Sequence, residues 1–155
     1  MNSVLHFYTF FIRITSNLQS PFLLVVRLFW GFCFFSAGLG KLLDINQVIV
    51  FFTTLDIPFP VYSAYLVAIT ELIGGAFLFI GLLSRVTTIP LITIMIVAYF
   101  TAEADAIRLF FADPINFITR TPFTFLLASL FILVFGPGKF SIDYILKKRF
   151  LRKKS

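Results

Sequence analysis

Long runs of apolar residues, each closed by polar residues, proline or glycine, occupy most of this chain. A helix needs about 20 mostly apolar residues to cross the hydrocarbon core of a bilayer. Four runs approach that length, and we predict a membrane-spanning helix from each. They are Pro21 to Leu43, Val61 to Leu83, Val86 to Ala102, and Pro122 to Gly136 with a start nearer Phe117. Because the runs are continuously apolar rather than alternating, they favour helices over the strands of a membrane barrel.

The segments between these runs predict how the helices are connected. Asp56 to Pro60 breaks the chain before the second span, and Ser84-Arg85 reads as a tight turn between antiparallel neighbours. Gly136 to Gly138 ends the fourth span. The sequence therefore predicts an all-α fold, a four-helix transmembrane bundle formed by residues 21–138.

Two shorter segments have the pattern of helices that lie in the membrane interface. In residues 1–20 five apolar side chains fall on one helical face, namely those of Phe7, Phe10, Phe11, Ile14 and Leu18. We predict an amphipathic interfacial helix there. A signal peptide is the alternative, but positive charge before the apolar run and a small-residue cleavage site are missing. Val48 to Phe52 is too short to span and is predicted to lie in the opposite interface.

Composition agrees with a membrane protein and removes several classes of function. Hydrophobic residues make up 59% of the chain and charged residues 13%, against roughly 45–50% and about 25% in typical soluble domains. Cys33 is the single cysteine and His6 the single histidine, so a disulfide scaffold and a Cys/His metal site are excluded. The sequence has no nucleotide-binding glycine pattern and no Ser/His/Asp set. We therefore predict no catalytic residue and no metal, and leave enzymatic activity open.

The basic residues predict the orientation in the membrane, because Lys and Arg concentrate on the cytoplasmic side. Four spans place both termini on one side. That side holds nine basic residues: Arg13, Arg85, Lys139, Lys147, Lys148, Arg149, Arg152, Lys153 and Lys154. The other side holds three: Lys41, Arg108 and Arg120. Both termini are therefore predicted to be cytoplasmic.

Much of the net charge of +6 comes from the C-terminal tail, residues 139–155. Six of its basic residues are predicted to contact anionic lipid headgroups: Lys147, Lys148, Arg149, Arg152, Lys153 and Lys154. Nucleic acid binding is the alternative for a basic tail. A cluster next to a membrane span favours a topology anchor that touches lipid.

Ionisable residues inside membrane spans are the first place to look for function. In the first span Arg27, Gly31, Phe34, Gly38 and Lys41 form one stripe along the helix. In the second span Ala64, Ala68, Glu71 and Gly75 repeat the rhythm, with Gly74 adjacent. Small residues let helix backbones approach closely. We therefore predict that Gly31, Gly38, Gly74 and Gly75 pack helices together and that the charges face the bundle interior.

Arg27, Lys41 and Glu71 are the candidate site. Arg27 and Lys41 are separated by about 21 Å of helix, and we expect Glu71 midway between them in height. An ion-paired site could hold a polar ligand head or a quinone carbonyl. Two alternatives stay open. The two basic residues could reach out to headgroups while a protonated Glu71 links helices, or the charges could form a proton or ion pathway.

The same residues resemble the DoxX family of small bacterial and archaeal membrane proteins. The resemblance covers about Val25 to Tyr144. It rests on four segments in order: Arg27 to Leu42, Leu55 to Pro60, Glu71 to Arg85, and Gly136 to Asp143, the last resembling a closing Gly-Pro-Gly and Ser-x-Asp signature.

The resemblance implies a four-helix transmembrane bundle in the cytoplasmic (inner) membrane, with Arg27, Lys41 and Glu71 as the functional polar set. Some members are associated with thiosulfate:quinone oxidoreductases, quinol oxidases, or complexes that handle oxidative stress. It thus implies an accessory or quinone-interacting component of a membrane redox assembly, with other redox subunits as partners and quinone as a possible bound cofactor. The alternatives are a scaffold that recruits partners and a small-solute transporter.

Overall fold

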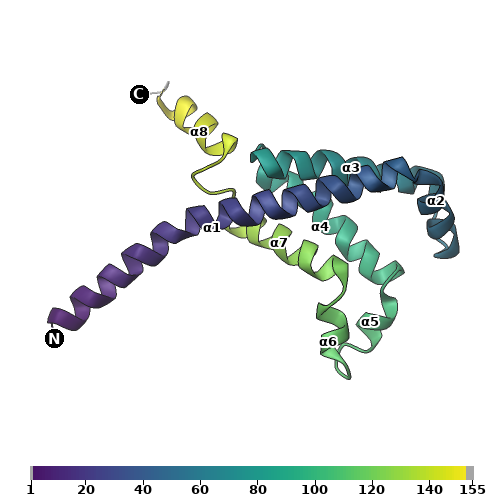
Figure 1. The fold of residues 1–155 in the computed structure, drawn as a ribbon, viewed down its shortest axis with the longest axis horizontal. Coiled ribbons are helices and arrows are strands. Elements are labelled where there is room, and N and C mark those ends of the chain that lie inside the picture. The colour runs from purple at the N-terminus through teal and green to yellow at the C-terminus, as the bar shows by residue number, and fades with distance from the viewer. Residues whose placement is uncertain (1, 153–155) are drawn as a thin grey trace.

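The computed structural model describes residues 2–152, and for residues 2–7, 13, 14, 16, 17 and 150–152 it describes the backbone alone. The described chain folds into eight helices (Figure 1). They are α1 (Asn2–Leu43), α2 (Ile45–Thr54), α3 (Pro60–Ile80), α4 (Ser84–Thr101), α5 (Ala104–Arg108), α6 (Pro114–Ile118), α7 (Thr121–Phe135) and α8 (Ile142–Arg152).

The second half of α1 packs lengthwise against α3, and α4 packs against α7. Side chains from all four helices meet in a small core, formed by Phe34, Leu78, Leu91, Met95 and Ile132. Large apolar side chains also cover the outside of the bundle, among them Val25, Phe29, Leu66, Ile73 and Phe100. An apolar exterior around a small core is what a bilayer requires, because lipid rather than water is the surrounding solvent.

Among the residues that the structure describes, three helices are long and apolar enough to cross a membrane: Leu18–Leu43 within α1, Pro60–Ile80 and Ser84–Thr101. α7 is apolar but has only 15 residues. The predicted all-α membrane fold is confirmed. The number of crossings, and with it the fourth span, stays a prediction.

The turn between α3 and α4 differs from the one predicted. Ser84 and Arg85 open α4, and the chain reverses at Gly81 to Leu83 instead. Gly81 has φ of 74° and ends α3 as a left-handed cap, a conformation that glycine adopts without a Cβ penalty. Sequence polarity favoured the Ser-Arg pair, but the backbone conformation that stops a helix favoured the glycine three residues earlier.

The predicted interfacial segment is the first half of α1, which continues through Pro21 into the first span and extends well beyond the bundle (Figure 1). Phe10, Phe11 and Leu18 are exposed, while the side chains of Phe7 and Ile14 lie outside the described set. Contact of this segment with a membrane surface stays a prediction.

Candidate functional site

The centre of the candidate site is an ion pair between the first and third helices. Lys41 lies in the last turn of α1, and its Nζ donates to Oε2 of Glu71, which lies in the middle of α3. The Glu71 side chain is 3% exposed and that of Lys41 30%. The acid is therefore enclosed by protein, whereas the amine also faces open space.

The register of α1 against α3 is set by their glycines. A Cβ on Gly38 would collide with the backbone of Ala68 and Leu72, and a Cβ on Gly31 would collide with that of Phe79. Gly75 lies equally close to the backbone of α1. This contact holds the last turn of α1 beside Glu71.

The expectation that Glu71 lies midway between Arg27 and Lys41 was wrong. Glu71 is level with the segment from Gly38 to Lys41, because the packing register, rather than the position within each apolar run, fixes relative height. Arg27 lies at the other end of the pair of helices, beside Gly81. The predicted trio therefore separates into one ion pair and one distant arginine.

A cavity of about 790 Å³ opens beside the ion pair. Its walls are formed by the last turns of α1, by α2 and the turn after it, by α3 and α4, and by the first turns of α7. Most of the lining is apolar, including Phe52, Leu66, Ile94, Met95 and Phe125. Lys41, Glu71 and Asp56 supply charged groups to its lining, and Tyr62 also lines it. A largely apolar cavity with a few polar groups is the usual form of a small-molecule site.

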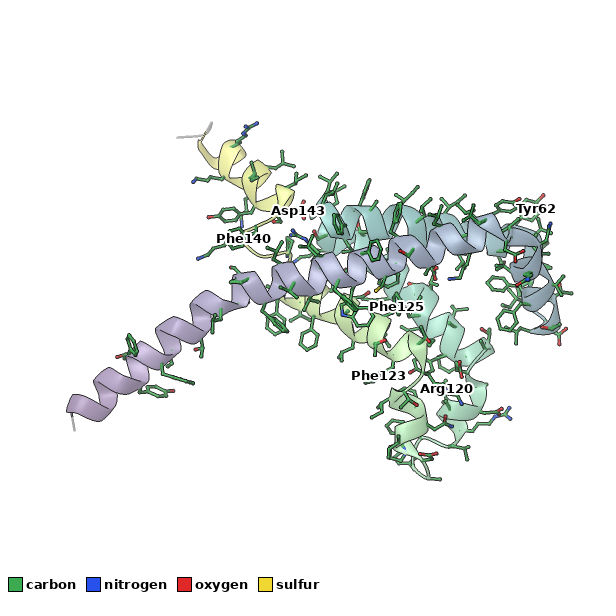
Figure 2. The ribbon with its side chains drawn as sticks, in the orientation of Figure 1. Tyr62, Arg120, Phe123, Phe125, Phe140 and Asp143 are labelled. Atoms are coloured by element: carbon green, nitrogen blue, oxygen red, sulfur yellow. The ribbon has the colours of Figure 1, made fainter. Side chains whose placement is uncertain are left out.

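Arg27 fastens the C-terminal segment to the bundle. Its guanidinium donates to the Pro137 carbonyl at 2.9 Å and to the Phe140 carbonyl at 2.6 Å. Asp143 lies next to this contact and accepts from the backbone N–H groups of Leu83 and Ser84, at 2.7 and 2.9 Å. Phe140 and Asp143 lie at one end of the bundle and Tyr62, on the cavity wall, at the other (Figure 2).

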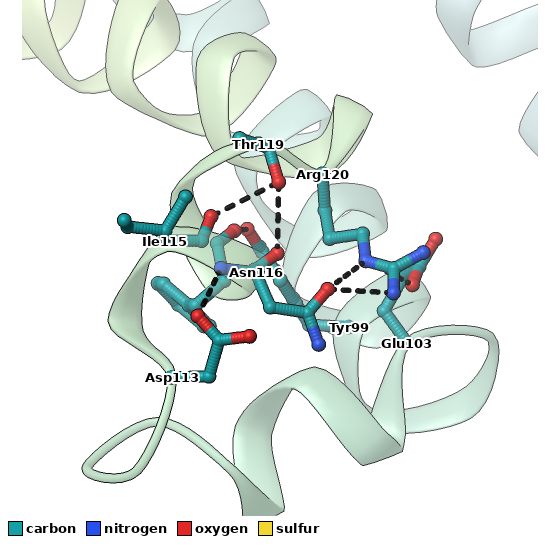
Figure 3. Close-up of polar contacts among 8 residues, drawn as sticks. Tyr99, Glu103, Asp113, Ile115, Asn116, Thr119 and Arg120 are labelled. Atoms are coloured by element: carbon teal, nitrogen blue, oxygen red, sulfur yellow. Dashed lines mark hydrogen bonds and ion pairs between the residues drawn. The ribbon is translucent and has the colours of Figure 1, made fainter.

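The sequence analysis missed a polar cluster, drawn in Figure 3, whose Glu103 and Arg120 directly follow and precede the cavity-lining residues Ala102 and Thr121. Arg120 lies 3.3 Å from Glu103 and donates two hydrogen bonds to the Asn116 side chain. Tyr99 donates to the Phe117 carbonyl at 2.9 Å. The cluster connects the end of α4 to the start of α7, and neither charge pattern nor helical periodicity signals it, because its members come from three short segments.

Four basic residues of the tail fall on α8: Lys147, Lys148, Arg149 and Arg152. Lys147, Lys148 and Arg149 are exposed on α8. For Arg152 only the backbone is described, and Lys153 and Lys154 lie outside the described residues. Their contact with anionic lipid stays a prediction.

A comparison with known protein families matches the first two thirds of the bundle, including both helices of the Lys41–Glu71 pair. The sequence pattern of DoxX matches residues 22–104, which run from the first span to the end of α4 and include Arg27, Lys41 and Glu71. The chain belongs to the DoxX family. The matched residues contain both helices of the ion pair, whereas α7 and α8 lie beyond them.

Two curated relatives extend the comparison of this DoxX protein. The uncharacterized membrane protein Rv3486 of Mycobacterium tuberculosis is 30% identical over 141 residues, which cover 83% of each chain. CatD of Bacillus subtilis, provisionally named an oxidoreductase, is 34% identical over 83 residues, which cover 54% of this chain and 60% of CatD. No solved structure matches the chain.

Proposed function

We propose that this DoxX protein binds a small amphipathic molecule of the quinone class at Lys41 and Glu71, as an accessory component of a membrane redox assembly. The observation that carries the proposal is a buried ion pair at the wall of a large apolar cavity. The provisional oxidoreductase name of CatD supports the redox context.

The chemistry of the pair suits a quinone head group. Lys41 uses one of its three N–H donors on Glu71 and can donate another to a carbonyl oxygen. Lys41 donates the one hydrogen bond that the Glu71 side chain receives from the described residues, so its second oxygen can accept from a hydroxyl. The apolar walls would hold the ring and the start of an isoprenoid tail. Electrons would come from partner subunits.

We further propose an inner-membrane location with several crossings and both termini in the cytoplasm, on the charge asymmetry of the loops. The cavity then opens toward the outer leaflet.

Ligand binding can be measured through the single tryptophan. Trp30 contacts Phe125 edge to face, with ring centroids 5.1 Å apart, and Phe125 lines the cavity. Decylubiquinone is therefore expected to quench Trp30 fluorescence in a saturable way. The double variant Lys41→Met/Glu71→Gln removes both charges together and should weaken binding about tenfold or more, since a hydrogen bond to a charged group contributes about 1.5–3 kcal/mol.

Decylbenzene, which has the tail without the carbonyls, is the matched control ligand and should bind the two proteins equally. Quenching that does not saturate, or an affinity unchanged in the double variant, would contradict quinone binding at this pair.

The orientation is tested by single cysteines in a Cys33→Ser background, placed at Asn116 and at Ser155. In intact cells an impermeant thiol reagent is expected to label position 116 and leave position 155 unlabelled until the cells are lysed. Labelling at position 155 alone in intact cells would reverse the proposed topology.

A further inference from the structure

A smaller pocket of about 380 Å³ lies at the end of the bundle opposite the quinone cavity. It is formed by the start of α4, by the loop from Pro137 to Ser141, and by the first turns of α8. Two basic side chains line it, Arg85 from α4 and Lys147 from α8. Arg27 holds the loop through the carbonyls of Pro137 and Phe140, and Asp143 of α8 accepts from the backbone at the start of α4.

The acid in this pocket is already engaged. Both carboxylate oxygens of Asp143 accept backbone N–H groups, one from Leu83 and one from Ser84. Neither Arg85 nor Lys147 forms an ion pair within the part of the chain that the structure describes. Arg85 donates one guanidinium N–H to the Val134 carbonyl at 3.1 Å, and its other N–H groups can donate to a ligand. The pocket therefore presents two exposed cations and one carboxylate, Asp143, whose oxygens are already occupied by backbone N–H groups.

The surroundings of the two cations are apolar. Leu83 and Val86 line the pocket and are 54% and 61% exposed, and Ile145 on α8 is 52% exposed. A ligand that fits must carry a negative charge at one end and leave hydrocarbon against these side chains. Guanidinium and ammonium groups at the membrane boundary bind phosphate groups through charge-assisted hydrogen bonds.

We infer that Arg85 and Lys147 form a binding site for the phosphate of an anionic phospholipid. The site holds one lipid between α4 and α8, with its acyl chains along Leu83 and Val86. It differs from diffuse attraction of the basic tail, because Lys148 and Arg149 on the same helix do not line the pocket. The inference is independent of the proposed quinone site, which shares no residue with it.

The test counts phospholipids retained by the full-length protein in mild detergent, by native mass spectrometry during titration with phosphatidylglycerol. Arg85→Gln/Lys147→Gln is expected to lower the affinity for the most tightly bound lipid about 25-fold, because each of the two charges contributes about fivefold. Lys148→Gln/Arg149→Gln also removes two positive charges, both from α8, and should leave the affinity for that lipid unchanged. Lys147→Gln alone, which leaves the Arg85 contact with Val134 intact, should weaken it about fivefold.

Three results would overturn the site. Equal losses in the two double variants would mean diffuse attraction, and equal retention of phosphatidylcholine would remove the role of net negative charge. Displacement of the lipid by millimolar inorganic phosphate would assign the pocket to a free anion instead.

Discussion

Replacing Glu71 with glutamine is expected to lower the free energy of unfolding by about 2–3 kcal/mol. Removing one partner of a buried ion pair costs about 3–5 kcal/mol, because the remaining charge is left uncompensated. The cost here should be smaller, since the Lys41 side chain is 30% exposed and can turn toward the cavity. Thermal unfolding of the purified protein in mild detergent measures the difference.

A double-mutant cycle tests whether Lys41 and Glu71 act as an ion pair or as two independent side chains. If Lys41 and Glu71 are coupled, Lys41→Met/Glu71→Gln should be more stable than the sum of its single variants predicts, by about 1–3 kcal/mol. The matched control is Glu103→Gln, which makes the same chemical change in the more exposed pair with Arg120 and should cost only about 0–1 kcal/mol.

The cycle also distinguishes a ligand site from a packing contact. A site predicts that decylubiquinone binding stays weak in the double variant even where its stability recovers. Additive losses in the cycle would show instead that the two charges do not depend on each other, and would remove the ion pair as the basis of the site.

The helices could be predicted from the sequence because apolar length and punctuation depend on local composition. Pro60 and Gly136 lie at or beside helix ends, where the missing N–H of proline or the positive φ of glycine starts or stops a helix. The α3–α4 turn shows the limit of this reading. The residues that look most polar, Ser84 and Arg85, are helical, and the turn is decided by a backbone conformation that polarity does not report.

Sequence periodicity grouped Arg27, Lys41 and Glu71, but it did not predict which of the three would meet. Periodicity placed Lys41 and Glu71 on facing stripes, and the structure joins them. Periodicity along each helix says nothing about how far one helix is shifted along the other. That shift depends on which glycine meets which backbone, and Gly38 opposite Leu72 places Glu71 near Lys41 and far from Arg27.

Contacts between segments distant in sequence could not be predicted either, because patterns along one segment do not report which other segment it meets. Arg27 and Phe140 are 113 residues apart, and Asp143 caps α4 from 59 residues away. The Ser-x-Asp sequence at 141–143 marked the segment without indicating its role. A carboxylate that follows a helix break is a candidate cap for a neighbouring helix, but only the fold identifies which helix receives it.

Adding a methyl group at Gly75 is expected to disturb the site by separating α1 from α3. A Cβ at this position would meet the backbone of Phe34 and Phe35 in α1, closer than real Cβ contacts occur. Backbone cannot turn aside as a side chain can, so Gly75→Ala must push α1 away from α3. Overpacking of a tight contact costs about 1–3 kcal/mol, and we expect the upper end of that range.

Gly40→Ala is the matched control, because a Cβ there would meet nothing within 4 Å. This substitution makes the same chemical change in the same pair of helices. Since alanine favours a helix over glycine by about 0.5–1 kcal/mol, Gly40→Ala should leave the protein as stable or slightly more stable.

Thermal unfolding and decylubiquinone binding are measured for both variants. If the glycine contact sets the register that joins Lys41 to Glu71, Gly75→Ala should lose binding and stability together while Gly40→Ala keeps both. Equal behaviour of the two variants would show that α1 and α3 tolerate separation and that the ion pair does not depend on their close approach.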